Sequence, residues 1–513
     1  MFKKLIALML VLLMVVPLIV SCGDKDTDKD NDGKGPSYDT DNAIQDDDPY
    51  AEKNAEIDEY IDELALAHKL NGKSFVYIGG GAQAPDPESD GETGDVQKDA
   101  FYFRSRDIED KFGLDWTDYQ PEQVEGGGHA VVEAVKQDVL AGSQAYDAGY
   151  GTPVAVAGPL FRNDSLADAS EYTVVDFERE WWPAALRDTY HINGAVYFLN
   201  GPIVSSNYID THCVVFNKQV ADDYGIEDLY DLVRSGEWTY DKMFEIAGAI
   251  PENTSGAGAY RYMRPHGVAT LFACGYQITN YDQNAAPYVA DALPAELSDL
   301  ADKFSPIFSD NTQTVHTKGV RNHASAEDFA EKYDGYEGAD EMFDDDKALF
   351  YFVTTGDAAE LRKLEVDFGI LPLPKGSDAQ ADYISYVEPW SAFNVFIPKT
   401  TKDPAVTDVV LEAMAALGER YIKPALYDTI LKGRSVKDFE SKDMLDIIFE
   451  TKKYDIIDFI APDGDTNTDS TFVKIHKEAI QESSGNLASQ YFLQAMLVNR
   501  NIQSIIASIN AAN

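Results

Sequence analysis

The sequence predicts an α/β fold, because strand-like and helix-like segments alternate along most of the chain. Ser74–Ile78 has the apolar, β-branched and aromatic composition of a buried strand. Four valines then recur near the spacing of one helix face: Val131, Val132, Val135 and Val139. Gly142 stands where this helix would end, and residues 146–151 again have the pattern of a strand. Strand, helix and strand in succession are typical of a sheet covered by helices.

Size and charge narrow the class of protein. A chain of 513 residues with 44% hydrophobic content has room for more than one core, since domains run to roughly 100–200 residues. We therefore expect two or three compact units. The formal net charge of -47 excludes a nucleic-acid partner, because such affinity comes largely from Lys and Arg that neutralise phosphates. Three cysteines are too few for a disulfide scaffold, and Cys213 and Cys274 either pair or remain free thiols.

The N-terminus predicts export and a lipid anchor. Lys3 and Lys4 precede an apolar run over residues 5–20, which is shorter than the roughly 20 residues of a membrane span. Residues 18–22 are similar to a bacterial lipobox, which makes residues 1–22 a signal peptide and Cys22 a lipidated residue. Acyl chains such as palmitate would hold the mature chain on the extracellular face of the cell membrane. The alternative is a plain secretory signal with an incidental cysteine.

Residues 23–52 are acidic and nearly free of apolar side chains, so we expect a flexible tether. Within them Asp28, Asp30, Asp32 and Gly33 copy the first half of a calcium loop. No helical pattern flanks that loop, which favours a tether over a calcium site. The eight histidines are scattered, and we expect no metal and no cofactor.

The next segments follow the alternating pattern. Ile57, Tyr60, Ile61 and Leu64 predict an amphipathic helix before the first strand. After that strand, residues 79–84 match the dinucleotide fingerprint, but Pro85 and Pro87 occupy the place of the helix that would receive the phosphates. The glycines therefore predict a turn that a small ligand can approach closely.

The middle of the chain predicts one strand and two helices. Residues 212–216 are strand-like, Asn217 can cap a short helix, and Gly225 closes it. Residues 236–239 then open a second helix. Further on, residues 366–370 alternate as a strand. A helix begins at Pro404 and is expected to end at Gly418, and further helices follow.

Five motifs in order resemble one protein family. They are Ala141-Gly142 with Tyr146-Asp147, Phe216-Asn217-Lys218, Gly236 with Trp238-Thr239 and Asp241, the block at 347–375, and residues 424–448. Together they resemble the extracellular solute-binding proteins (family 1, sugar-type) of bacterial ABC importers, over about residues 74–510. The family usually has Gly where Asp346 stands, so we expect that turn to differ. Trp238 is expected to be structural.

The resemblance implies a two-lobed, periplasmic-binding-protein-like fold of type II, with lobes that are discontinuous in sequence. The first lobe would comprise residues 53–207 and 367–420, and the second residues 208–366 and 421–513. Hinge crossings would lie near residues 205–210, near 366–368 and near Tyr421. The chain would be a monomeric, non-enzymatic protein that captures an oligosaccharide between its lobes and delivers it to an ABC permease.

Loop position and residue type then indicate eight ligand contacts. The stacking platforms for sugar rings would be Tyr150, Trp182 and Trp390. Gly81 would allow backbone approach, and the polar contacts would be Arg264, Thr354, Thr355 and Glu388. Trp181 and Trp182 are equally compatible with a place in the core.

Two other functional classes stay open. Carboxylates are abundant, so an anchored glycoside-active enzyme is compatible with the sequence, as is a surface module for glycan sensing or adhesion without transport. The chain has no HExxH, GxSxG, CxxC or Walker A motif, which argues against metalloprotease, serine hydrolase, redox and ATPase activity. The specific solute and the permease are not defined by the sequence.

Overall fold

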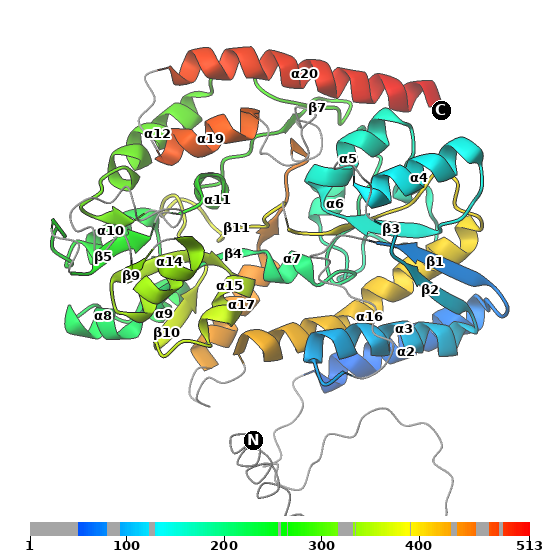
Figure 1. Cartoon of the computed structure of the whole chain (residues 1–513), viewed down its shortest axis with the longest axis horizontal. Helices are drawn as coiled ribbons and strands as arrows, with labels where there is room; N and C mark the ends of the chain where they lie inside the picture. Colours follow the sequence, from blue (N-terminus) through cyan, green and yellow to red (C-terminus); the bar gives the residue numbers. More distant parts are fainter. Residues whose placement is uncertain are drawn as a thin grey trace, which may run out of the picture. The chain divides into compact units, whose positions relative to one another are not determined.

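The computed structural model has the predicted α/β class, and Glu52–Asn513 form one compact unit (Figure 1). The structure describes residues 50–79, 93–122, 129–254, 258–263, 265–315, 332–333, 335–389, 391–431, 439–457, 471–481 and 486–512. Cys22, residues 23–49 of the predicted tether and its calcium-like loop lie outside these ranges, while residues 51 and 52 of that tether already belong to the first described helix. Within them, Cys213 and Cys274 are free thiols, and no helix is both long and apolar enough to cross a membrane.

The first sheet has four strands in the order β12-β3-β1-β2. Three of them are parallel: β1 (Ser74–Ile78), β2 (Asp115–Tyr119) and β3 (Ala148–Gly151). The fourth, β12 (Asn394–Phe396), is antiparallel to β3, with Val395 opposite Tyr150. Parallel neighbours need a crossover connection, which α3 (Val96–Phe112) and α4 (Ala130–Ala141) supply.

The second sheet has five strands in the order β10-β4-β9-β5-β8. Their bounds are β4 (His212–Asn217), β5 (Tyr260–Met263), β8 (Thr314–Val315), β9 (Ala348–Thr354) and β10 (Phe368–Leu371). Every residue of β4 is buried, as is typical of a strand covered on both faces. Two further sheets have two short strands each: β6 (Asn280–Tyr281) pairs with β7 (Pro287–Tyr288), and β11 (Ser385–Tyr386) pairs with β13 (Lys452–Lys453).

Helices surround both sheets (Figure 1). Before the second sheet they are α2 (Ala51–Ala67), α3, α4, α5 (Pro153–Arg162), a 3-10 turn η1 (Ala169–Glu171), α6 (Ala185–Asp188) and α7 (Ser206–Ile209). Those that follow β4 are α8 (Lys218–Asp223), α9 (Leu229–Ser235), α10 (Tyr240–Ala247), α11 (Gly267–Ala273), α12 (Ala295–Phe308), α14 (Gly335–Asp344) and α15 (Thr355–Leu361). The C-terminal helices are α16 (Pro404–Leu431), α17 (Phe439–Glu450), α19 (Thr471–Gln481) and α20 (Leu487–Ala512).

Several helix boundaries that the sequence predicts are confirmed. Gly142 ends α4 with φ 62°, as predicted. Gly236 was expected to open the next helix but instead ends α9 with φ 76°. Both glycines lie in the left-handed region that glycine adopts without strain. The Thr239 side chain accepts the amide proton of Lys242 and caps α10. These predictions succeed because a cap depends on a few neighbouring residues.

Asn217 organises the corner where β4 ends. Its side-chain oxygen accepts the amide proton of Val220 at 2.9 Å and caps α8, as predicted. Its amide group donates to Asp346 Oδ1 at 2.8 Å. Asp346 has φ 58°, a backbone conformation that favours glycine. The residue that differs from the family pattern therefore adopts a glycine-type turn, with the Asn217 amide bound to its side chain.

The position of β10 bears on one expected lobe boundary. We expected residues 367–420 to return to the first lobe, but Phe368–Leu371 pair antiparallel with β4 and belong to the five-stranded sheet. The chain rejoins the four-stranded sheet only at β12. Alternating apolar residues identify a strand but not its partner, because partner choice depends on distant segments.

The end of α16 differs from the predicted helix end. This helix does not end at Gly418 but continues to Leu431. A Cβ atom at position 418 would lie 2.0 Å from the carbonyl oxygen of Pro202, so glycine is needed there for close approach and not as a helix end. Val406–Leu417 pack in one core cluster with Phe75, whereas Ile422 and Ile430 pack in another with Val215. The predicted lobe limits themselves stay a prediction.

Candidate functional site

Two chain segments run side by side between the two sheets. The first contains α7 and precedes β4, and the second covers residues 387–394, which precede β12. The Asn207 amide donates to the carbonyl oxygen of Phe393 at 2.8 Å, and the Phe393 amide donates to Ser206 Oγ at 2.8 Å. The Glu388 amide donates to the carbonyl oxygen of Asp210 at 2.8 Å. We call this pair of segments, residues 205–211 and 387–394, the crossing (Figure 1).

Strand ends from both sheets approach the crossing. At the end of β3, the ring centroid of Tyr150 lies 5.7 Å from that of Phe393. In the second sheet, β9 ends at Thr354, which lies opposite His212 in the register, and His266 follows the end of β5. Ligands of α/β proteins bind outside the carboxyl ends of strands. The crossing is therefore the candidate site.

Glu388 is the charged centre of this region. Its Oε2 atom lies 3.2 Å from His212 Nε2 and 3.8 Å from His266 Nε2. Burial by itself would raise the pKa of Glu388, but the charges of His266 and His212 and the hydrogen bond from His212 lower it to about 2. The carboxylate is therefore ionised at neutral pH and can accept hydrogen bonds from hydroxyl groups.

Aromatic and imidazole rings form a stack beside Glu388. The centroids of His212 and His266 lie 5.3 Å apart, and the ring of Tyr386 lies 5.7 Å from that of His212. Phe272 packs on Tyr386 at 4.8 Å. These contacts restrict the rotamers of both histidines. The ligand atoms of His212, His266 and Glu388 all lie within 4.8 Å of one another, which is close enough to hold a metal ion.

The predicted threonines have structural bonds. Thr354 is the N-cap of α15, and its hydroxyl and the Asp357 carboxylate form a reciprocal capping box. Thr355 is fully buried, and its hydroxyl donates to the carbonyl oxygen of Tyr208 in the crossing. The structure thus brings Thr354, Thr355 and Glu388 to the same region. Their contact with a ligand stays a prediction.

The predicted aromatic platforms are buried where the structure describes them. Tyr150 is 4% exposed. Trp182 is 3% exposed, and its indole N–H donates to Glu412 at 2.9 Å, while that of Trp181 donates to the same carboxylate at 3.0 Å. Both indoles therefore donate hydrogen bonds to the buried carboxylate of Glu412. The ligand role of Trp182 stays a prediction. Gly81, Arg264 and Trp390 lie outside the described residues.

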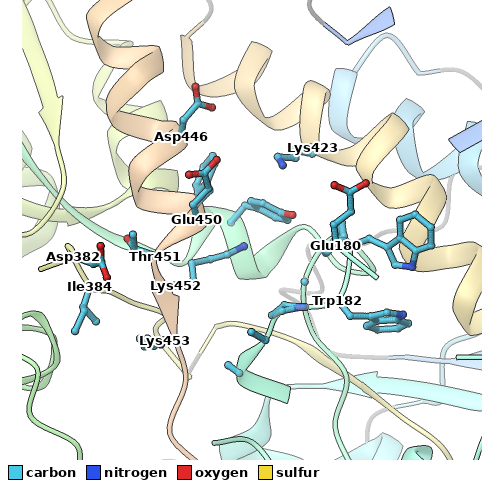
Figure 2. A pocket seen from close by; sticks show the side chains of 18 of the residues that line it. Glu180, Trp182, Asp382, Ile384, Lys423, Asp446, Glu450, Thr451, Lys452 and Lys453 are labelled. Carbon is cyan, nitrogen blue, oxygen red and sulfur yellow. The ribbon is translucent and has the colours of Figure 1, made fainter. Parts of the chain in front are cut away.

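The structure also has a cavity of about 830 Å³. Tyr208 of α7 borders it, and residues of α16, α17 and β13 line it. Figure 2 shows Glu180 and Trp182 on one side and Asp382 and Ile384 on the other. Trp182 is the one candidate contact that the described lining contains. The remaining described candidates lie elsewhere, so the structure does not bring Trp182 together with Glu388.

His212 and His266 are the residues of this site that sequence analysis missed. His212 opens β4, and His266 is the N-cap of α11. They are far apart in the sequence from each other and from Glu388. Single histidines without a regular spacing carry no signal, so only the folded chain brings them together.

Comparison with known proteins supports the fold. No family model matches the chain, and no curated protein matches it in sequence. A solved structure of a cyclo/maltodextrin-binding protein with maltotetraose aligns at TM-score 0.52 and 12% identity, over 84% of this chain and 98% of that one. The GacH receptor of Streptomyces glaucescens GLA.O, solved unliganded and with acarbose, aligns at TM-score 0.50 and 12% identity, over 83% and 99%. The chain thus has the two-lobed α/β fold of periplasmic-binding-protein-like solute-binding proteins.

Proposed function

We propose that the chain is an extracellular, lipid-anchored solute-binding protein that captures an oligosaccharide and delivers it to an ABC permease. The observation that carries the proposal is the convergence of strand ends from both sheets on the crossing, beside the ionised Glu388. The structural neighbours with this fold are described with maltotetraose and with acarbose, which supports a carbohydrate as the solute.

Two lobes joined by a crossing suggest a mechanism. A solute that contacts both lobes stabilises a closed state only by its differential affinity for that state. A micromolar ligand supplies about 8 kcal/mol in total, and part of it is used for closure. Bending would take place in residues 205–211 and 387–394, because few residues connect the sheets there.

Side-chain chemistry suggests which part of the sugar each candidate residue contacts. Tyr150, Trp182 and Trp390 would stack on the apolar faces of sugar rings. Arg264, Glu388, Thr354 and Thr355 would bind the hydroxyl groups, and Gly81 would let the ring approach the backbone. Cys22 would carry the lipid that keeps a monomeric chain near its permease.

Calorimetry with a panel of glycans tests this proposal, with chelator present so that metal ions play no part. We expect an oligosaccharide to bind, and Trp390→Ala to weaken it about 30-fold, since a central Trp contributes roughly 2 kcal/mol. Trp116→Ala is the matched control, because Trp116 lies near the start of the edge strand β2. It should leave affinity unchanged.

Two results would overturn the proposal. One is tight binding of a peptide or another solute with no glycan bound. The other is chemical conversion of the bound glycan during long incubation, read by chromatography, which would favour the glycoside-active enzyme. Thermal melts of both variants confirm that they fold.

A further inference from the structure

Two histidines and one glutamate meet at the crossing in an arrangement that resembles a metal site. Glu388 Oε2 lies 3.2 Å from His212 Nε2 and 3.8 Å from His266 Nε2. One ligand atom from each residue lies within 4.8 Å of the others, and among the described residues no second group of this kind is found.

We propose that His212, His266 and Glu388 bind a divalent transition-metal ion of the Zn²⁺ type. In a tetrahedral site with bonds of about 2.0–2.1 Å, neighbouring ligand atoms lie about 3.3–3.4 Å apart. The two distances to Glu388 Oε2, 3.2 Å and 3.8 Å, bracket that spacing. The ligand atoms of His212 and His266 lie within 4.8 Å of each other, so the side chains must rotate to close the site around one ion.

The ligand types select the ion. Imidazole nitrogen suits Zn²⁺ and its first-row neighbours, and two histidines with one glutamate form a known three-ligand zinc set. Ca²⁺ and Mg²⁺ prefer oxygen ligands. We therefore expect Zn²⁺ to bind far more tightly than either of them.

Each of the three metal-binding side chains is held in place by its neighbours. His212 is the first residue of β4 and lies opposite Thr354. His266 directly precedes α11, and the Glu388 amide is bonded to the carbonyl oxygen of Asp210. The ring of Tyr386 stacks on both imidazoles, at 5.7 Å and 6.3 Å between centroids. Such support lowers the cost of ordering the ligands around an ion.

The three side chains are shielded but reachable. The exposed fractions are 10% for His212, 22% for His266 and 16% for Glu388. Lys477 also lies near enough to interact with the Glu388 carboxylate, so it competes with an ion for that charge. Three protein ligands leave a fourth position for water or a solute oxygen.

A bound ion would tie one segment of the crossing to the second sheet. Glu388 belongs to residues 387–394, while His212 opens β4 of the second sheet and His266 lies between β5 of that sheet and α11. The ion would hold one crossing segment against that sheet and so restrict its bending. This inference does not depend on the identity of the solute, because metal binding is measured without any glycan.

Calorimetric titration of the chelator-treated, untagged chain with Zn²⁺ tests the site. We expect one ion per chain and a Zn²⁺-dependent rise in the thermal midpoint. His266→Gln and Glu388→Gln should each weaken Zn²⁺ binding by at least about 10-fold, since even outer partners of a metal site contribute that much. His68→Gln is the control, because His68 is an exposed histidine just after α2, and it should bind like the unaltered chain.

Visible absorption of the Co²⁺ form gives a second readout. The unaltered chain should show the intense bands of a four-coordinate site, and the two ligand variants should lose them while melting cooperatively. No Zn²⁺ binding, or equal affinity in His266→Gln, Glu388→Gln and His68→Gln, would show that the three residues form only a hydrogen-bonded cluster. Glycan binding in chelator would then still support the proposed function.

Discussion

The chain passes between the region of the first sheet and that of the second in two contrasting ways. At the crossing, short segments are joined by bonds such as that of Asn207 to Phe393. In α16, one continuous helix of 28 residues makes the same passage, and its backbone approaches Pro202 where Gly418 provides the space. The crossing can bend by local rotation of a few residues, whereas a helix resists bending because its hydrogen bonds act together.

The comparison indicates which contacts control movement. Side chain–backbone bonds of the crossing are individually modest, at about 1 kcal/mol each, so closure can break and reform them. The contact of Gly418 with Pro202 is steric and leaves no room for a larger residue. Three substitutions test this difference.

Gly418→Ala should destabilise the chain by up to about 2 kcal/mol. Alanine normally stabilises a helix by about 1 kcal/mol relative to glycine, but here its Cβ would meet the Pro202 oxygen at 2.0 Å, and overpacking costs about 1–3 kcal/mol. Denaturant unfolding followed by circular dichroism measures the loss. Ala55→Gly, at an exposed position of α2, is the control for propensity alone. A Gly418→Ala variant that is more stable than the unaltered chain would contradict a close contact between positions 418 and 202.

Lys452 lies near residues of both passages, and its lowered pKa predicts that the stability of the chain depends on pH. Its ammonium lies 3.5 Å from the ring centroid of Tyr208 in α7, which favours the charged form. Burial and the nearby Lys423 of α16 nevertheless lower the pKa of Lys452 from 10.5 to about 7. The folded chain then binds fewer protons than the unfolded chain between these values, so the free energy of unfolding rises with pH in that window.

Between pH 7 and pH 9 we expect Lys452 to contribute a rise of about 2 kcal/mol in the free energy of unfolding. Lys452→Met should remove this rise, while Lys453→Met at the exposed neighbouring position should retain it. Denaturant titrations at both pH values give the comparison. An equal pH slope in the two variants would show that the Tyr208 ring outweighs burial.

Asn207→Ala should have the smallest effect on stability, about 1 kcal/mol, because it removes one buried hydrogen bond, to the carbonyl oxygen of Phe393. Asn163→Ala, which removes an exposed bond to the carbonyl oxygen of Pro159, should cost less. Hydrogen exchange of the Phe393 amide tests the local consequence, and we expect faster exchange in Asn207→Ala only. Unchanged exchange there would mean that the remaining bonds, of Phe393 to Ser206 and of Glu388 to Asp210, hold the two segments together.

Local features of this chain could be predicted because few residues define them. Gly142, Asn217 and Thr239 end or begin helices as expected. Glu388 was expected to contact the ligand, from residue type and position alone, and this stays a prediction. The expected end of α16 at Gly418 was wrong, since glycine ends a helix and also permits close contact, and the sequence does not distinguish the two roles.

By itself, the sequence determined the α/β class, the caps and the alternation of strands and helices, because these depend on spacing and on neighbouring side chains. Only the tertiary structure decided that β10 pairs with β4, that Gly418 meets Pro202 and that His212 and His266 meet Glu388. Each of these contacts joins residues far apart in the chain. Their partners are chosen by the packing of whole sheets and helices, which no local pattern records.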